Sequence, residues 1–236
     1  MPDPLLPCYI PTELVRFKYP LPHLATALGG SDPVKIVAIG SSSTAGREDV
    51  VPYPCRLELE MRKRFFRRMI GVLNKGIGGE EAPVEFKRFK RDVIDEAPSL
   101  VVWQVGTNAI FRPNDFSMKD TVEKIAEGLQ QLSELAMDVV LMDLQYAPAM
   151  LLDDKAEAAA QMVSLIAAAA DQAKVNVFKR FALMRHWTVY DFVGLDQMID
   201  PSDPDRLHQN DWSTACVARA LCGAILDAAP PPKGTT

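Results

Sequence analysis

A serine-rich turn follows a short apolar run near residue 40. Residues 34–39 read VKIVAI, and Gly40 then leads into four consecutive hydroxyl residues at positions 41–44. An apolar run of this length that is rich in β-branched residues is typical of a buried parallel strand. Open α/β sheets carry their functional groups at the carboxyl ends of the strands. The pattern therefore predicts Ser42 as a nucleophile at that edge of a sheet.

A serine hydroxyl is a weak nucleophile unless a base takes its proton, and histidine is the usual base. The chain has three histidines, and only His208 has a carboxylate three residues earlier, Asp205. In a turn, this spacing lets the carboxylate accept a hydrogen bond from the imidazole, which fixes its tautomer and stabilises the imidazolium. Ser42, His208 and Asp205 are therefore the predicted catalytic residues, although an isolated D-x-x-H pair is more typical of a solvated loop.

Hydrolysis of an ester also needs hydrogen-bond donors for the oxyanion that develops on the carbonyl. A glycine-rich segment, NKGIGG at 74–79, follows one apolar run, and GTN at 106–108 follows another. The backbone N–H of Gly79 is not obstructed by a side chain, and the amide of Asn108 offers two N–H donors. Together with the N–H of Ser42 itself, these groups form the predicted oxyanion hole.

Five apolar runs and the amphipathic segments between them predict the elements that position these groups. Strands are expected over residues 34–39, 70–73, 99–105, 138–144 and 175–178. Helices are expected over residues 54–66, 83–96, 117–136, 153–173, 181–187 and 211–228, with a polar loop over 194–210. Strands that alternate with helices favour right-handed crossovers and a sheet covered on both faces. The sequence thus predicts an α/β fold, a three-layer α/β/α sandwich with a mainly parallel five-stranded sheet in the flavodoxin-like order 2-1-3-4-5.

We expect three parts along the chain. Residues 1–33 form a proline-rich N-terminal arm that lies over the domain, residues 34–228 form the hydrolase domain, and residues 229–236 form a flexible tail. The 236 residues suffice for a full core without a metal or a disulfide.

Four sequence blocks in this order resemble the SGNH hydrolases, also called GDSL-type esterases and lipases. The usual motifs G-D-S-x-T, N-x-G-x-x-G, G-x-N-D and D-x-x-H stand here as GSSST at 40–44, NKGIGG at 74–79, GTNA at 106–109 and DRLH at 205–208. The resemblance implies Ser42 as nucleophile, His208 as general base and Asp205 as its orienting acid. It also implies Gly79 and Asn108 as partners of the Ser42 N–H in the oxyanion hole.

The chain departs from the family motifs at two positions. Ser41 and Ala109 each replace an aspartate, the first before the nucleophile and the second after the oxyanion-hole asparagine. Neither position carries a catalytic role in the family, so the implied triad is retained. The hydrogen bonding around the serine turn must nevertheless differ.

The resemblance implies a serine hydrolase that cleaves carboxylic esters through an acyl-enzyme, without a cofactor or metal. Short acyl groups, in particular acetyl on a carbohydrate, are favoured because the sequence has no long apolar lid. A lysophospholipase or thioesterase of the same family is the alternative, followed by a non-catalytic acyl- or sugar-binding protein. Tyr53, Arg112, Tyr146 and Trp212 follow the predicted strand ends or the histidine, and are the expected substrate contacts.

Composition limits the other partners and the compartment. A formal net charge of −5 argues against a nucleic-acid partner, and no apolar run has the roughly 20 residues of a membrane span. The four cysteines at positions 8, 55, 216 and 222 lack any C-x-x-C or metal-ligand spacing, which favours free thiols or small core residues and a reducing compartment. Because the N-terminus has no signal-peptide pattern, a soluble, cytoplasmic protein is expected by default; export of a longer precursor and the oligomeric state stay open.

Overall fold

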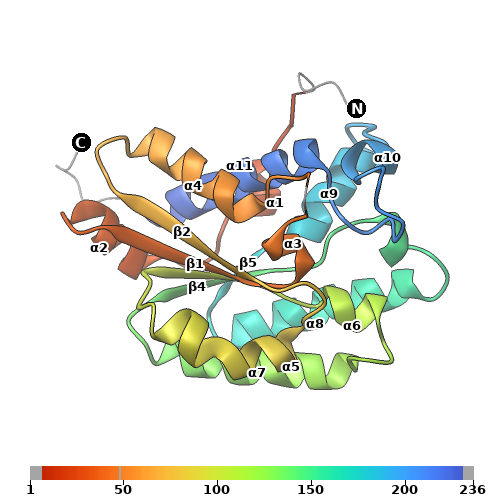
Figure 1. The fold of residues 1–236 in the computed structure, drawn as a ribbon, viewed down its shortest axis with the longest axis horizontal. Coiled ribbons are helices and arrows are strands. Elements are labelled where there is room, and N and C mark those ends of the chain that lie inside the picture. Colours follow the sequence, from red (N-terminus) through yellow and green to blue (C-terminus); the bar gives the residue numbers. More distant parts are fainter. Residues whose placement is uncertain (1–6, 48, 231–236) are drawn as a thin grey trace.

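The computed structural model describes residues 7–47 and 49–230, and these residues contain one five-stranded sheet (Figure 1). All four strand pairings are parallel, and the order is β2-β1-β3-β4-β5. The strands are β1 (Val34–Gly40), β2 (Ile70–Gly76), β3 (Leu100–Gln104), β4 (Asp138–Met142) and β5 (Asn176–Phe178). The predicted fold and strand order are confirmed.

The three central strands are apolar because helices cover both of their faces. Ile36 of β1, Val101 of β3 and Leu141 of β4 are completely buried. In Figure 1, α4 and α11 lie side by side over one face of the sheet, whereas α5, α7 and α8 lie over the other. The helices of the described chain are α1 (Thr12–Val15), α2 (Pro22–Gly29), α3 (Ser42–Ala45), α4 (Tyr53–Arg64), α5 (Ala82–Glu85), α6 (Thr107–Phe111), α7 (Met118–Ser133), α8 (Lys155–Gln172), α9 (Arg180–Val189), α10 (Leu195–Met198) and α11 (Asp211–Ala228).

The helices α1, α2, α3 and α6 were not expected, and local winding also differs from the expected pattern in two further segments. The helix expected over residues 83–96 changes pitch twice, from α5 to the 3-10 turn Phe86–Arg88 and then to the π turn Lys90–Ile94. The polar loop expected over 194–210 contains the single-turn helix α10, which is preceded by Gly194, whose backbone N–H donates to Gln197 Oε1. Neither change alters the position of a strand end.

The N-terminal arm packs on the domain through α2 and through backbone hydrogen bonds. Leu24 and Leu28 of α2 are buried in the core. The N–H of Leu24 donates to Asp138 Oδ2 at the start of β4, and the N–H of Leu21 donates to the carbonyl of Ala228. Residues 1–6 of the predicted arm and residues 231–236 of the predicted tail lie outside the described residues.

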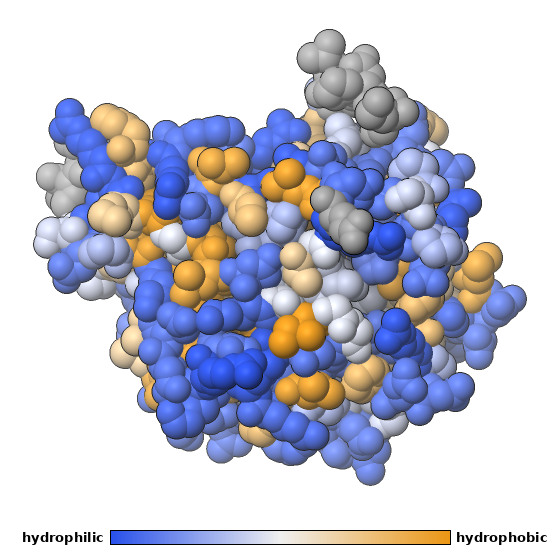
Figure 2. All heavy atoms as spheres, in the orientation of Figure 1, coloured by the Kyte–Doolittle hydropathy of each residue, from blue (hydrophilic) through white to orange (hydrophobic). Residues whose placement is uncertain are grey.

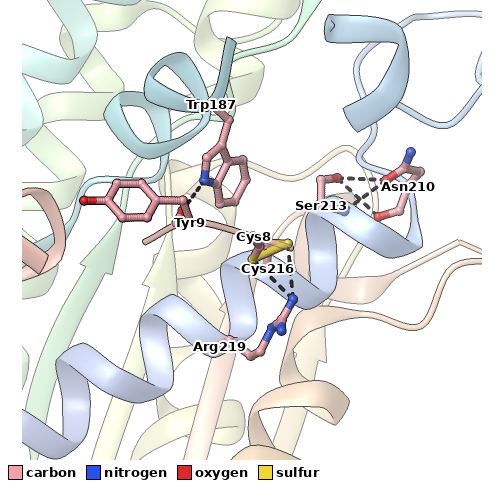
Figure 3. The surroundings of a disulfide bond; sticks show 7 residues. All are labelled: Cys8, Tyr9, Trp187, Asn210, Ser213, Cys216 and Arg219. Atoms are coloured by element: carbon pink, nitrogen blue, oxygen red, sulfur yellow. Dashed lines mark hydrogen bonds between the residues drawn. A yellow bond between two sulfur atoms is a disulfide. The ribbon is translucent and has the colours of Figure 1, made fainter. Parts of the chain in front are cut away.

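A disulfide joins Cys8 of the arm to Cys216 of α11 (Figure 3). Beside it, Trp187 Nε1 of α9 donates to the carbonyl of Tyr9 at 2.7 Å, so the arm is fixed to two helices. The prediction that the cysteines are free thiols or small core residues is therefore wrong for these two, which are disulfide-bonded, and Cys55 and Cys222 are the free ones. The two half-cystines are 208 residues apart in sequence, so no local spacing could indicate the pairing. Because disulfides are typical of oxidising compartments, the inference of a reducing compartment loses its basis.

Among the described helices, none has both the length and the apolarity needed to cross a bilayer. The face of the molecule shown in Figure 2 is mainly hydrophilic, with apolar side chains in small, separated groups.

Candidate active site

Ser42 lies at the carboxyl edge of the sheet, as the first residue of the single-turn helix α3. The turn from β1 into α3 is tight at Gly40, where a Cβ atom would come within 2.5 Å of Thr44 Oγ1 and 2.9 Å of Gln104. Only glycine fits this space, because a side chain would displace the packed neighbours. The Oγ of Ser42 lies 2.8 Å from Nε2 of His208, so the predicted nucleophile and base are within hydrogen-bond distance.

The acid beside His208 is Asp203, not the predicted Asp205. Asp203 Oδ2 lies 2.9 Å from His208 Nδ1 and also accepts the backbone N–H groups of Leu207 and His208 at 2.8 and 2.7 Å. The Asp203 side chain is fully buried. Burial disfavours the charged carboxylate, but the hydrogen bonds from His208 and Leu207 outweigh it and lower the pKa of Asp203 to about 2. Asp203 is therefore an ionised hydrogen-bond acceptor at the back of the imidazole.

The backbone turn over residues 203–206 explains why Asp205 is displaced. The N–H of Arg206 donates to the carbonyl of Asp203, and Arg206 has a left-handed φ of 54°. This turn brings the chain back so that the N–H groups of residues 207 and 208 point at the Asp203 carboxylate. Asp205 lies in the middle of the turn with an exposed side chain, and it offers Asp203 only its backbone N–H, at 3.4 Å.

Hydrogen bonds at both ends hold the loop that carries Asp203 and His208. The N–H of Asp200 donates to the carbonyl of His208 at 2.9 Å, within an antiparallel bridge between Ile199 and Gln209. Asn210 then caps α11 by accepting the N–H of Ser213 at 3.0 Å (Figure 3). His208 is thus fixed three residues before the start of α11, a long and largely buried helix.

The structure brings the predicted oxyanion donors to the same edge. The segment that ends in Gly79 passes close to the nucleophile, since a Cβ on Gly78 would lie 3.9 Å from the Cβ of Ser42. Gly79 has a φ of +80°, which favours glycine. Asn108 of α6 donates one amide N–H to the carbonyl of Glu80, the residue after Gly79, at 2.7 Å. The second N–H of this amide is not needed for that bond.

A buried carboxylate that the sequence analysis missed ties this segment to α6. Glu81 accepts the backbone N–H groups of Gly106, Asn108 and Ala109 at 2.8 to 3.2 Å. Burial raises the pKa of Glu81, and these backbone donors counteract the rise. The N-terminal end of α6 is thereby fixed against the glycine-rich segment. Two acidic residues directly after NKGIGG were the only available signal.

Two buried glutamines lie beside the serine turn: Gln104, which the sequence did not single out, and Gln145, which follows the fourth predicted strand and was expected at the mouth of the site. Gln104 Oε1, at the end of β3, accepts the N–H and the hydroxyl of Ser41 at 3.0 and 2.9 Å. Gln145 Oε1 accepts Thr107 Oγ1 at 3.0 Å and Arg180 Nη2 at 2.8 Å. A polar residue at the end of a wholly apolar run, as in SLVVWQV, is the signal that could have indicated Gln104.

The four predicted substrate contacts have different environments. Tyr53 is buried, and burial raises the pKa of its hydroxyl to about 12. Arg112 is exposed, with Nη1 only 3.1 Å from where a Cβ on Gly79 would stand. Tyr146 packs edge-on against Phe181, and Trp212 packs edge-on against Trp187 in the same manner. A role for these four residues in substrate binding stays a prediction.

A small pocket opens beside the serine and the histidine. Its cavity volume is about 20 Å³, close to that of a single water-sized group. Ser42, Ser43 and His208 line one part of it, and Arg47 and Thr214 line another.

The chain as a whole is similar to a known protein family and to several solved structures. A model of the Non-GDSL lipase-like family matches residues 7–231. No curated protein sequence matches significantly. Axe2, an acetylxylan esterase from Geobacillus stearothermophilus, has a similar structure with a TM-score of 0.70 and 18% identity over 83% of this chain and 96% of its own. LAE5, an α/β hydrolase from the metagenome of Lake Arreo, Spain, gives a TM-score of 0.68 and 19% identity over 84% of this chain and 99% of its own.

Variants of Axe2 that are described as catalytic replace a serine, an aspartate and a histidine by alanine. Its aspartate and histidine lie three residues apart, as Asp205 and His208 do here, whereas Asp203 lies five residues before His208. Since the family model matches nearly the whole chain, the protein belongs to the Non-GDSL lipase-like family.

Proposed function

We propose that this protein is a serine hydrolase of the SGNH type that removes short acyl groups, acetyl above all, from carbohydrate esters. The observation that carries the proposal is the continuous chain of contacts from Ser42 Oγ to His208 Nε2 and from His208 Nδ1 to Asp203 Oδ2, at 2.8 and 2.9 Å. A serine, an imidazole and a buried carboxylate in this geometry are what acyl transfer requires.

Each residue has one task in the proposed mechanism. His208 Nε2 takes the hydroxyl proton while Ser42 Oγ attacks the ester carbonyl, and Asp203 stabilises the imidazolium through Nδ1. The N–H groups of Ser42 and Gly79 and the free amide N–H of Asn108 bind the oxyanion. His208 then gives its proton to the leaving alcohol. Water attacks the acyl-enzyme with His208 again as base, and the acid is released.

Three observations support a short acyl group and a sugar alcohol. The pocket beside the serine has room for about one small group. The face in Figure 2 is mainly hydrophilic, which does not suit a long acyl chain. Acetylxylan esterase, which shares the fold, acts on an acetylated polysaccharide.

The test compares initial hydrolysis rates for p-nitrophenyl esters from acetyl to palmitoyl, and for acetylated xylo-oligosaccharides, in wild type and Ser42→Ala. We expect turnover that is highest for acetyl and that falls by at least about 10⁴-fold in Ser42→Ala. Ser43→Ala is the matched control, because Ser43 is adjacent but its hydroxyl only reaches Gln145, at 3.4 Å. Rates that rise with the length of the acyl chain would instead indicate a lipid or an acyl thioester as the substrate. Absence of Ser42-dependent turnover on every ester would refute the hydrolase and favour an acyl- or sugar-binding protein.

A further inference from the structure

Arg47 reaches from the nucleophile segment to the loop that carries the acid and the base. It follows α3 and Gly46, five residues after Ser42. Its Nη1 donates to Asp203 Oδ1 at 2.6 Å and lies 3.1 Å from His208 Nδ1. Asp203 is thus held from two sides, with Oδ2 facing the imidazole and Oδ1 facing the guanidinium.

A second buried carboxylate faces the same guanidinium. Asp200 Oδ1 accepts the N–H and the hydroxyl of Ser202 at 2.8 and 2.7 Å. Asp200 Oδ2 is buried without a hydrogen bond, and it lies 3.8 Å from Arg47 Nε. The side chains of Asp200 and Asp203 are 4% and 0% exposed, respectively. Apart from His208, Arg47 is the one cation within 4.0 Å of either carboxylate in the described part of the chain.

The net charge of the groups around His208 depends on Arg47, and this charge affects whether the imidazole is protonated. With Arg47 present, the group formed by Asp200, Asp203, Arg47 and neutral His208 carries one net negative charge; without Arg47 it carries two. Tyr53, the other titratable group that lines the pocket, is neutral below a pKa of about 12. A cation close to Nδ1 disfavours the imidazolium, and an uncompensated Asp203 favours it. Both effects of removing Arg47 therefore favour protonation of His208.

We propose that Arg47 is a positioning residue of the hydrolase: it orients the Asp203 carboxylate toward His208 and keeps the imidazole unprotonated, and thus active as a base, to lower pH. This inference rests on the proposed serine hydrolase function. The guanidinium does not contact the substrate in this inference; it acts on Asp203 and His208. Because its N–H donors point in several directions, it can contact Asp203 while another of its nitrogens faces Asp200.

The experiment measures kcat/KM for p-nitrophenyl acetate from pH 4 to 9 in wild type, Arg47→Met and Arg47→Lys. In Arg47→Met we expect kcat to fall by about 10- to 100-fold, and the acidic limb of the profile to move upward by about one pH unit. Arg47→Lys keeps the positive charge, so the acidic limb of its pH profile should stay near the wild-type position. Its kcat should recover only in part, because a lysine lacks the forked N–H donors of the guanidinium. Arg56→Met is the matched control, because Arg56 pairs with Asp211 at 2.5 Å, outside the Asp203–His208 pair.

The ring signals of His208 in an NMR titration give a readout that does not need turnover. In Arg47→Met their midpoint should move upward together with the kinetic limb. If Arg47→Met does not fold, the same titration is made in Arg47→Met/Asp200→Asn and compared with Asp200→Asn alone, so that the two proteins still differ only by Arg47. A His208 titration unchanged by the loss of Arg47 would overturn the inference, even if the rate fell. Lack of Ser42-dependent hydrolysis in wild type would instead refute the proposed function, and the two failures are thereby distinguished.

Discussion

Replacement of Asp203 by asparagine tests whether Asp203, rather than Asp205, is the acid of the proposed triad. Asp203 Oδ2 accepts three N–H groups, from the ring and backbone of His208 and the backbone of Leu207, while Oδ1 accepts Arg47. An asparagine amide has one oxygen and one NH₂ group. If the NH₂ group takes the Oδ2 position, it faces three N–H donors. The ring proton of His208 must then move from Nδ1 to Nε2, and Nε2 can no longer accept a hydrogen bond from the Ser42 hydroxyl. If the NH₂ takes the Oδ1 position, it meets the Arg47 donor.

Neither orientation preserves the negative charge that stabilises the imidazolium. The same exchange in a serine protease triad lowers kcat by about 10⁴-fold, which corresponds to about 5.5 kcal/mol of transition-state stabilisation. We therefore expect a loss of about 10³–10⁴-fold in kcat for Asp203→Asn. Asp205 is exposed and offers only its backbone N–H, so Asp205→Asn should remain within about threefold of wild type, in the range of a surface change.

The assay is kcat and KM for p-nitrophenyl acetate at pH 8, with circular dichroism and thermal melting to show that both variants fold. The opposite pattern, in which Asp205→Asn loses at least about 10³-fold and Asp203→Asn keeps its rate, would refute the argument from geometry. It would restore the assignment of Asp205 that the D-x-x-H motif implies.

Three further predictions concern the oxyanion hole, a buried acid and the disulfide. Asn108→Ala should lower kcat by about 10²–10³-fold while the melting temperature stays close to that of wild type, and a normal rate would contradict its role as an oxyanion donor. Burial raises the pKa of Asp143 to about 7; since the folded state then holds a proton that the unfolded state has lost, stability falls as pH rises from 5 to 7. Between pH 5 and pH 8, wild type should accordingly lose about 2–3 kcal/mol of unfolding free energy relative to Asp143→Asn, as measured by urea titration. The same pH dependence of the unfolding free energy in both proteins would show that Asp143 is not the responsible group. Cys8→Ser opens a bridge that spans 208 residues and should lower the unfolding free energy by about 2–5 kcal/mol, whereas Cys55→Ser, at an exposed free thiol, should change it by less than about 0.5 kcal/mol.

The sequence by itself determined the sheet and indicated the candidate nucleophile, Ser42, and the candidate base, His208. Buried parallel strands are apolar runs bounded by turn residues, so all five strands could be predicted from local patterns. Parallel strands end at one edge, so Ser42, Gly79 and Asn108 were expected to converge there. His208 could be selected because an activated serine needs a base and the chain offers only three histidines.

Tertiary structure alone decided which groups surround His208. Asp203 and Asp205 are both carboxylates within reach along the chain, and the left-handed turn at Arg206 determines which of them faces the ring. Arg47 meets Asp203 across 156 residues, and Cys8 meets Cys216 across 208. Such contacts arise from how helices and loops pack on the sheet and leave no periodicity in the sequence. The candidate nucleophile and base are therefore predictable from local sequence patterns, but the residues that contact and orient them depend on the packing of distant segments.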